Sequence, residues 1–322
     1  MKWKIVVLLV VALSVTIFEC GSARAGISGH YLPGVMGIRD IAMAEPGVYY
    51  LQYNLYYQVD KLKNKYGNTV DTVTVNLSKR RAIKTDIDFS LHVFATVPVL
   101  AWIPEKKILG ANFGFAILDY AAQVSFDFDE KTKRGNGIHE HNSTVGLGDP
   151  YIRPIWLGWH FPRFDVTANY GVWLPFGRYE HGSVNNIGRG FTTHMIQMGG
   201  AYYLTENRAS ALTLTGTYEI NGKLGGADLT PGQRLSIEWG FSQFLSPAFA
   251  VGVTGYSNWE VTRDHGKEAS PLRDRVHGIG GEINYLFPKL NNLFISVRHL
   301  QEYEARSRTL GHLSCLTFAY KF

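Results

Sequence analysis

The chain has 322 residues, of which 45% are hydrophobic and 13% aromatic, with 34 glycines and a formal charge of +5. Its mean hydropathy of −0.08 suits a soluble protein, and equally a barrel whose lumen-facing half is polar. After residue 25 no apolar run approaches the roughly 20 residues of a spanning helix, which excludes a helical membrane protein. The basic residues are dispersed. We interpret the one cluster, Lys79-Arg80-Arg81, as a solvated loop, and expect no nucleic-acid partner.

Residues 1–25 are expected to be a secretory signal peptide. Lys2 and Lys4 precede an apolar stretch that ends at Phe18, and Ala23-Arg24-Ala25 forms a small-x-small cleavage site. The alternative of a retained anchor is disfavoured because the stretch has about 14 residues, fewer than the roughly 20 that span a bilayer.

The two cysteines of the chain are Cys20 and Cys315. Lipid attachment at Cys20 is a second alternative to the signal peptide, but Glu19 occupies the preceding position, where a small residue is needed. If the signal is removed, Cys315 remains alone and no disulfide can form within the chain.

Residues 26–47 do not form a convincing strand, because glycines and prolines interrupt the segment and charged residues lie among the apolar ones. We predict that this segment folds into the lumen of a barrel as a plug; a periplasmic tail is the alternative. The residues expected to act in a plug or gate are His30, Pro33, Arg39, Asp40 and Glu45. For Arg39 and Asp40 a latch to the barrel wall is favoured over a gate.

Residues 48–322 contain twelve strand-like segments, separated alternately by short and long connections. This layout is typical of outer-membrane barrels, with turns in the periplasm and loops outside the cell. The long connections are expected at about 60–83, 129–147, 177–189, 222–231, 263–273 and 304–309. Mixed patterns at 112–119 and 195–202 leave ten or fourteen strands open. The predicted fold is all-β, a transmembrane antiparallel barrel.

Several segments alternate between apolar and polar residues, as the walls of such barrels do. The clearest are Phe164–Leu174, Leu212–Tyr218 and Leu235–Ser242. We assign their apolar side chains to the lipid and their polar ones to a water-filled lumen; a soluble sandwich is the alternative. The candidate lumen residues are Asp149, Arg153, Asp165, Asn169 and Glu238.

Asp149 and Arg153 lie near a bend at Gly148-Asp149-Pro150. Two interpretations stay open: part of a charged ring in a pore, or a tie between the bend and a neighbour. The dense tyrosines Tyr49, Tyr50, Tyr53, Tyr56 and Tyr57 are interpreted as aromatic girdles at the membrane boundary rather than a ligand-stacking ladder. For His139-Glu140-His141 we predict no metal site, since a third ligand is missing.

The chain ends in a strand whose apolar face carries Leu316, Phe318, Tyr320 and Phe322. Thr317, Ala319 and Lys321 occupy the other face. Phe318, Tyr320 and the terminal Phe322 resemble the signal by which bacterial outer-membrane barrels are recognised for assembly, so the barrel assembly machinery and outer-membrane lipid are expected partners.

A family resemblance covers nearly all of the chain after residue 25. It is carried by Gly29-His30-Tyr31-Leu32-Pro33-Gly34, Gly37-Ile38-Arg39-Asp40, Pro46-Gly47-Val48-Tyr49-Tyr50, Tyr66-Gly67-Asn68, Gly146-Leu147-Gly148-Asp149-Pro150, Pro154-Ile155-Trp156-Leu157-Gly158-Trp159-His160, Leu174-Pro175-Phe176-Gly177-Arg178-Tyr179, Asn185-Asn186-Ile187-Gly188, Gly252-Val253-Thr254-Gly255-Tyr256 and Gly278-Ile279-Gly280-Gly281. The order of these motifs resembles the outer-membrane proteins named for the meta-pathway of phenol degradation. The resemblance implies an outer-membrane barrel that carries hydrophobic compounds.

No nucleophile elbow, P-loop or dinucleotide motif is present, so we predict no enzyme, no catalytic residue and no cofactor. The expected function is a passive channel in the bacterial outer membrane for small hydrophobic solutes, with aromatic compounds as candidates. The alternative is a structural or adhesive barrel whose long loops bind an external partner.

Overall fold

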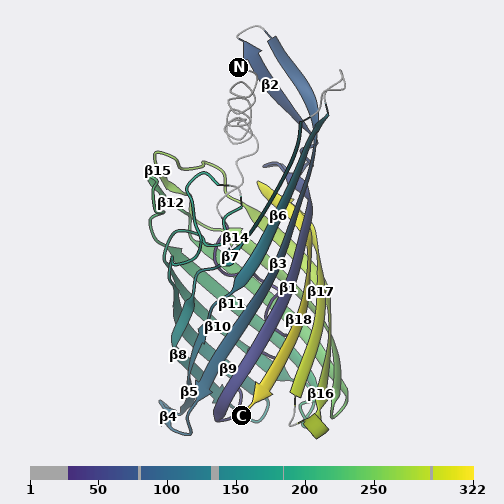
Figure 1. Cartoon of the computed structure of the whole chain (residues 1–322). Coiled ribbons are helices and arrows are strands. Elements are labelled where there is room, and N and C mark those ends of the chain that lie inside the picture. Colours follow the sequence, from purple (N-terminus) through teal and green to yellow (C-terminus); the bar gives the residue numbers. More distant parts are fainter. Residues whose placement is uncertain (1–27, 79–80, 132–137, 184, 291–292) are drawn as a thin grey trace.

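The computed structural model describes residues 28–78, 81–131, 138–183, 185–290 and 293–322, and nearly all of its regular structure is β (Figure 1). The strands are β1 Gly47–Lys63, β2 Thr72–Ser78, β3 Arg81–Ile103, β4 Lys107–Ile108, β5 Ala111–Leu118, β6 Ala121–Lys131, β7 Ile138–Leu147, β8 Tyr151–His160, β9 Phe164–Trp173, β10 Thr193–Tyr203, β11 Ser210–Asn221, β12 Leu229–Thr230, β13 Arg234–Ser246, β14 Phe249–Glu260, β15 His265–Gly266, β16 Arg275–Phe287, β17 Leu293–Arg306 and β18 Arg308–Lys321. A 3-10 helix, η1, covers Pro288–Leu290. None of the described residues lies in a helix that is long and apolar enough to cross a membrane. The predicted signal peptide lies outside the described residues.

Within the described ranges, twelve strands close into an antiparallel barrel. The last strand, β18, hydrogen-bonds to the first, β1, which pairs in turn with β3. From β3 the ring continues through β5, β8, β9, β10, β11, β13, β14, β16 and β17 back to β18. Both termini of the barrel wall therefore lie on neighbouring strands, and no open edge remains on this path. The predicted all-β barrel with about twelve strands is confirmed.

The third and fourth strands of the barrel are each divided in two. β5 and β6 are separated at Asp119-Tyr120, and β7 and β8 at residues 148–150. The lower halves pair as β5–β8, and the upper halves as the hairpin β6–β7. The prediction of a long loop at 129–147 is wrong, because polar pairs such as Asp127 with His141 continue the β6–β7 ladder far beyond the barrel.

The connections differ at the two ends of the barrel, as expected. Short turns gather at the end where the C-terminus lies, and longer loops at the opposite end (Figure 1). Two predicted loops are shorter than expected: β2 pairs with the extended start of β3, and the last connection is a tight turn at Ser307, with φ at 52°. β17 runs to Arg306 and β18 begins at Arg308, which leaves no loop at 304–309, although the ladder between these two strands already ends at the pair Gln301–His312.

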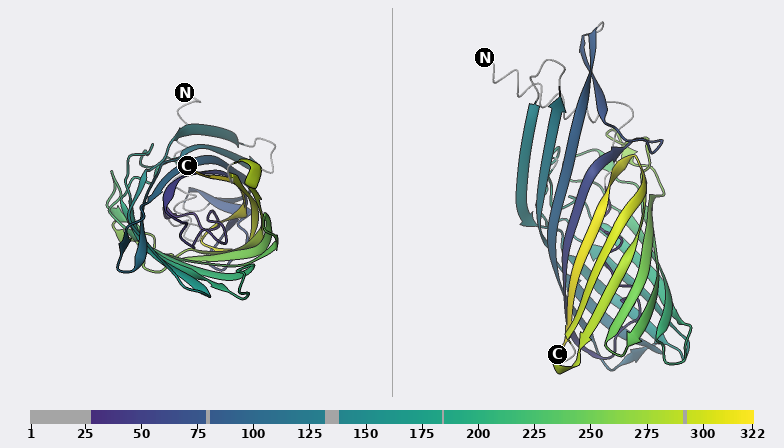
Figure 2. Two further views of the ribbon diagram at one scale, coloured as in Figure 1. Left: turned by 90° about the horizontal axis from the view of Figure 1, so that it is seen from below. Right: turned by 90° about the vertical axis from the view of Figure 1, so that its right-hand side faces the viewer.

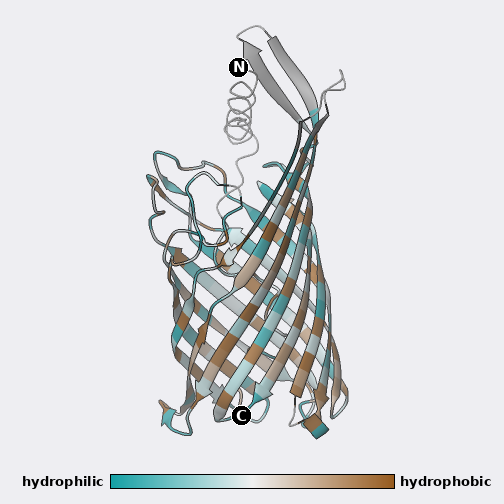
Figure 3. Ribbon diagram, in the orientation of Figure 1, coloured by the Kyte–Doolittle hydropathy of each residue, from teal (hydrophilic) through white to brown (hydrophobic). Residues whose placement is uncertain are grey.

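The outer and inner faces follow the predicted alternation over most of the wall. On β11, Leu214 is 59% exposed on the outside, whereas Thr213 and Thr215 are 9% and 6% exposed. On β13, Trp239 and Phe241 are exposed and Ser236 and Glu238 are buried. Hydrophobic and hydrophilic positions alternate along much of the barrel wall in Figure 3. An apolar outer surface is what a lipid-facing wall requires.

β1 and β3 have an apolar inner face, so the expectation of a polar inner face is wrong here. Leu55, Ala95 and Val99 are buried inside, whereas Asn54 and Thr96 face outward and share a 3.0 Å hydrogen bond. The apolar inner face has a physical reason: the buried apolar side chains of β1, β3 and β18 form one cluster against which Leu32 and Val35 of the N-terminal segment pack.

Candidate functional site: the lumen and its N-terminal segment

Residues 28–46 cross the interior of the barrel (Figure 2, seen from below). Near the loop end, His30 contacts Thr193 at the start of β10. Near the turn end, Arg39 contacts the carbonyl oxygens of Arg208 and Ala209. The segment therefore runs along the barrel from the loop end to the turn end, where β1 begins. The lumen position predicted for this segment is confirmed.

Three carboxylates of the wall bind the backbone of this segment. Oε1 of Glu219 on β11 accepts the N–H groups of His30 at 2.7 Å and Tyr31 at 2.9 Å. Glu238 on β13 accepts the N–H of Gly34 at 2.6 Å and the hydroxyl of Tyr31. A segment without helix or strand leaves its own amides unpaired, and these carboxylates satisfy them inside the barrel.

Glu282 on β16 continues this row of carboxylates. It accepts the N–H of Ile38 at 3.0 Å and forms a buried ion pair with Arg298 of β17 at 2.6 Å. Arg298 also donates to the carbonyl oxygens of Gly34, at 2.8 Å, and Val35. One buried ion pair thus binds both N–H groups and carbonyl oxygens of the segment. These hydrogen bonds are strong because one partner in each of them is charged.

Arg39 and Asp40 act as latches rather than as free gate charges. Arg39 donates to the Oγ of Ser242 at 2.5 Å and to the two carbonyl oxygens at the turn end, and it lies 4.5 Å from the ring of Phe244. Asp40 accepts the N–H of Gly37 at 2.7 Å and the hydroxyl of Tyr53 at 3.3 Å. Of the two interpretations left open by the sequence, the contacts favour the latch.

His30 and Asp149 join the segment to the bend in the fourth strand. Nε2 of His30 donates to Oδ2 of Asp149 at 3.0 Å. The backbone N–H groups of Gly177 and Arg189 donate to the same carboxylate at 2.8 and 2.6 Å. Burial alone would raise the pKa of Asp149, but these hydrogen bonds outweigh it and hold that pKa below its usual value. Asp149 is therefore a tie within the structure and does not pair with Arg153.

The other predicted residues of the segment lie in different surroundings. Pro33 is buried. The Glu45 side chain is 90% exposed near the turn end and lies 3.8 Å from the ammonium of Lys321. Glu45 is thus the one predicted plug residue that faces open solvent.

The remaining lumen candidates form separate contacts on the inner wall. Asp165 accepts from the hydroxyl of Tyr203 at 2.5 Å, and Asn169 donates to Gln197 at 3.0 Å. Arg153 lies over the rings of Tyr151 and Trp156. These side chains line one polar half of the wall, but they do not form a ring with Asp149.

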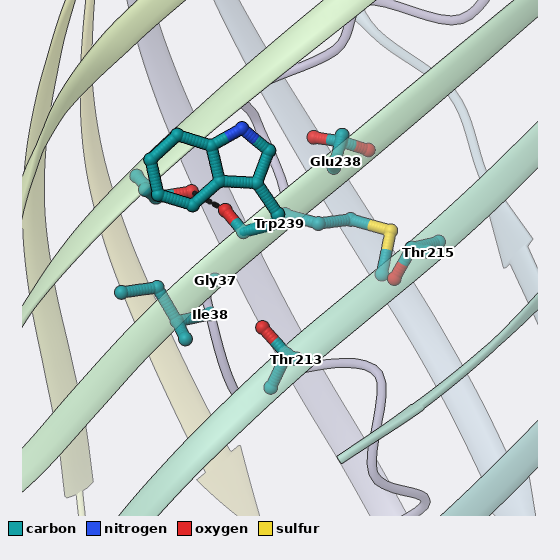
Figure 4. Close-up of a pocket in the computed structure, with 8 residues that line it drawn as sticks. Gly37, Ile38, Thr213, Thr215, Glu238 and Trp239 are labelled. Atoms are coloured by element: carbon teal, nitrogen blue, oxygen red, sulfur yellow. Dashed lines mark hydrogen bonds between the residues drawn. The ribbon is translucent and has the colours of Figure 1, made fainter. Parts of the chain in front are cut away.

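Beside β11 and β13 the space between the segment and the wall is small. Met36, Gly37 and Ile38 face Thr213, Thr215 and Glu238 across a cavity of about 20 Å³ (Figure 4). Such a cavity is large enough for about one water molecule.

The tyrosines of β1 are divided between the two faces. Tyr53 and Tyr57 point inward; Tyr57 donates to Glu302 at 3.0 Å. Tyr56 is exposed and bonds His92 on β3 at 2.9 Å. The interpretation of all five as boundary girdles is therefore wrong for Tyr53 and Tyr57.

The terminal aromatic residues occupy the outer face of β18. Phe322 is 73% exposed and lies 5.1 Å from the ring of Tyr320, while Phe318 pairs with Gln52 of β1 across the barrel closure. Their use as an assembly signal stays a prediction.

Sequence reasoning missed Glu219, Glu282 and Arg298, which make the main contacts to the segment. Glu219 follows Thr213, Thr215 and Thr217 on the polar face of its strand, so strand alternation could have found it. Glu282 and Arg298 lie opposite each other across β16 and β17, a register that the sequence does not reveal.

Most of the chain matches a known protein family. The model of the family described as "Putative MetA-pathway of phenol degradation" matches residues 61–318. The chain belongs to this family. No curated protein matches the sequence significantly. The family match confirms the resemblance found in the sequence motifs.

Solved structures share the fold of this family member. The COG4313 outer membrane channel from Pseudomonas putida F1 superposes with a TM-score of 0.66 at 14% identity, covering 91% of this chain and 100% of that chain. Two further structures are more distant. The CymD monoaromatic hydrocarbon channel has 9% identity and a TM-score of 0.43, covering 94% of this chain and 98% of that chain. A Pseudomonas aeruginosa FadL homologue has 10% identity and a TM-score of 0.39, covering 93% of this chain and 96% of that chain. The chain therefore has the closed β-barrel fold of an outer-membrane channel, and this fold agrees with the expected bacterial outer-membrane location.

Proposed function

We propose that this barrel is a passive channel for small hydrophobic compounds, with aromatic compounds as candidate solutes. The observation that carries the proposal is the apolar inner wall of β1, β3 and β18. An aqueous porin has a polar interior, whereas Leu91, Val93 and Val97 of this chain lie partly buried on the inside with the apolar cluster. An apolar wall lowers the free energy of an apolar solute by roughly 25 cal/mol for each Å² removed from water.

The size of the barrel supports this mechanism. A barrel with eight strands is filled by its side chains, and one with sixteen is an open pore. Twelve strands leave intermediate room, part of which residues 28–46 occupy. We propose that these residues act as a plug that narrows the lumen, and that solutes pass through the remaining space along the apolar wall, which they share with Leu32 and Val35. Solutes would then move down their concentration gradient, without a coupled energy source.

The N-terminal segment would stay in place during passage. Its backbone is held by Glu219, Glu238 and Glu282, and its side chains by Ser242 and Asp149. Breaking several charge-assisted hydrogen bonds at once would cost about 1.5–3 kcal/mol for each. A fixed constriction fits these numbers better than a segment that leaves the barrel for every solute.

Uptake by whole cells and by liposomes tests the proposal. Cells without the gene, parent cells and complemented cells are compared for the initial rate of uptake of a labelled monoaromatic hydrocarbon, with a labelled sugar as the control. Proteoliposomes that contain the purified chain repeat the measurement. The proposal predicts faster entry of the hydrocarbon only when the protein is present. Equal rates in all cells and in empty liposomes would refute it and favour an adhesive barrel.

A further inference from the structure

An aromatic row marks the outer face of the barrel near its loop end. Trp259 of β14, His277 of β16 and Tyr303 of β17 lie on three adjacent strands. The ring centroids of Trp259 and His277 are 5.5 Å apart, and those of His277 and Tyr303 6.1 Å. Tyr303 is exposed, and the exposed apolar residues Val253, Ile279 and Val297 follow below it on the same strands. Aromatic rows of this kind lie at the boundary between hydrocarbon and headgroups.

A basic hollow begins directly beyond this row. Trp259 pairs with Arg275, and Arg275 with Arg306, in the last register positions before the loops. Together with the loop residues Lys65, Arg263 and Arg273 they line an open hollow of about 510 Å³. The hollow therefore joins the aromatic row to a group of five basic side chains at the extracellular rim.

The acidic residues near the hollow compensate only part of this positive charge. Asp274 lines it but is engaged by Arg234 and Arg308, which do not line the hollow. Glu304 lies 2.6 Å from Arg275 and 3.4 Å from Arg306, so one carboxylate serves two guanidinium groups. Glu260 also lines the hollow, with its side chain buried.

Two donors at this site make no hydrogen bond among the described residues. The Nε atoms of Arg275 and Arg306 are buried and unbonded there, although the Nε of Arg306 lies 3.4 Å from Oε1 of Glu304. A buried donor without a hydrogen bond is unfavourable. Phosphate oxygens are well suited to accept from a pair of arginines, since the planar guanidinium group can form two parallel hydrogen bonds to a phosphate.

We propose that this hollow binds the phosphate of an outer-leaflet glycolipid. The phosphate would lie between Arg275 and Arg306, with Arg263, Arg273 and Lys65 around it. The sugar ring would contact Trp259, and the acyl chains would follow the apolar wall below Tyr303. A lipid satisfies the phosphate site and the aromatic row together, whereas a free anion would use only the first. Basic residues near a membrane surface strengthen the binding of anionic lipids.

The test compares two double variants of the detergent-purified full chain. Arg275→Gln with Arg306→Gln removes two charges at the hollow. Lys106→Gln with Lys107→Gln removes two exposed charges from the turn between β3 and β5 at the opposite end. Binding of a diphosphorylated glucosamine glycolipid, of its dephosphorylated form and of inorganic phosphate is measured by native mass spectrometry and calorimetry. Heat-modifiable gel mobility verifies folding.

The proposal predicts that the Arg275/Arg306 variant binds the diphosphorylated glycolipid at least tenfold more weakly than the parent, and that the Lys106/Lys107 variant binds it as the parent does. Dephosphorylation of the lipid should cause a similar loss. Equal binding by both variants, or equal binding of the dephosphorylated lipid, would overturn the site. Inorganic phosphate bound as tightly as the glycolipid would overturn the lipid assignment. If the double variant does not fold, Arg263→Gln with Lys65→Gln, at exposed loop positions, repeats the test with a smaller expected loss of about threefold.

Discussion

His30 and Asp149 are in direct contact inside the barrel, although 119 residues separate them in the sequence. The contact joins the start of the N-terminal segment to the bend that divides β7 from β8. Through Gly177 and Arg189 the same carboxylate also holds the loop after β9. One side chain thus couples the segment, the divided strand and an extracellular loop.

Replacement of Asp149 by Asn is expected to destabilise the barrel and to flatten its response to acid. The pKa of Asp149 is lower in the folded protein than its ordinary value of 3.8. Its stabilising contribution is therefore complete above about pH 3.8 and is lost as the pH falls through the lower folded value. At pH 7 the variant should lose about 1–3 kcal/mol.

Thermal unfolding in detergent from pH 7 to pH 2.5 measures this effect. The Tm of the parent should fall more steeply below pH 4 than that of Asp149→Asn. Asp71→Asn, at an exposed loop position, serves as control and should behave as the parent. Parallel pH profiles for Asp149→Asn and the parent would show that the carboxylate charge does not stabilise the fold.

Arg298→Met is expected to be severely destabilising, because it leaves Glu282 buried without its partner. Loss of one member of a buried ion pair costs about 3–5 kcal/mol. In the double variant Arg298→Met/Glu282→Met no unpaired charge remains, so the loss should be smaller than in the single variant. Urea unfolding followed by gel mobility gives the free energies; a double variant at least as unstable as Arg298→Met would contradict the pairing argument.

Val93→Thr with Val97→Thr tests the apolar wall. Threonine keeps the shape of valine but has a hydroxyl in place of one methyl group. Placing that hydroxyl in an apolar environment costs about 1 kcal/mol of free energy at each site. The two sites together give about 2 kcal/mol, so flux of a monoaromatic hydrocarbon into proteoliposomes should fall up to about thirtyfold, with ionic conductance unchanged. Val253→Thr, on the lipid-facing side, is the matched control. Unaltered hydrocarbon flux in the Val93/Val97 variant would exclude this wall as the path.

Strand alternation predicted much of the fold, because a closed wall imposes a period of two on every strand. The assignments on β11, β13 and β18 agree with the structure: Thr213, Glu238 and Thr317 face inward, and Leu214 and Phe322 outward. Trp173, which breaks the alternation on β9, is buried beside Tyr151 and His30, at 4.8 and 5.4 Å between rings. The exception thus reflects a contact with the N-terminal segment.

Alternation identifies two faces of a strand but not which face is inside. The general expectation of apolar side chains toward lipid and polar ones toward water does not hold for β1 and β3, where Leu55 and Ala95 lie in the lumen. It fails there because the lumen holds Leu32 and Val35, which offer apolar contacts that water would not. Strand alternation also could not show that Glu219, Glu238 and Glu282 bind the N-terminal segment, because that segment lies far away from them in the sequence.

Planar-bilayer conductance of a variant that lacks Gly29–Glu45 tests the proposed plug most directly. The parent and Glu45→Gln, a change at the exposed end of the segment, should give the same small single-channel conductance. The deletion variant should conduct ions several-fold better, since removal of the segment opens the lumen of a barrel of this width. A correctly folded deletion variant with the conductance of the parent would contradict a lumen narrowed by residues 28–46.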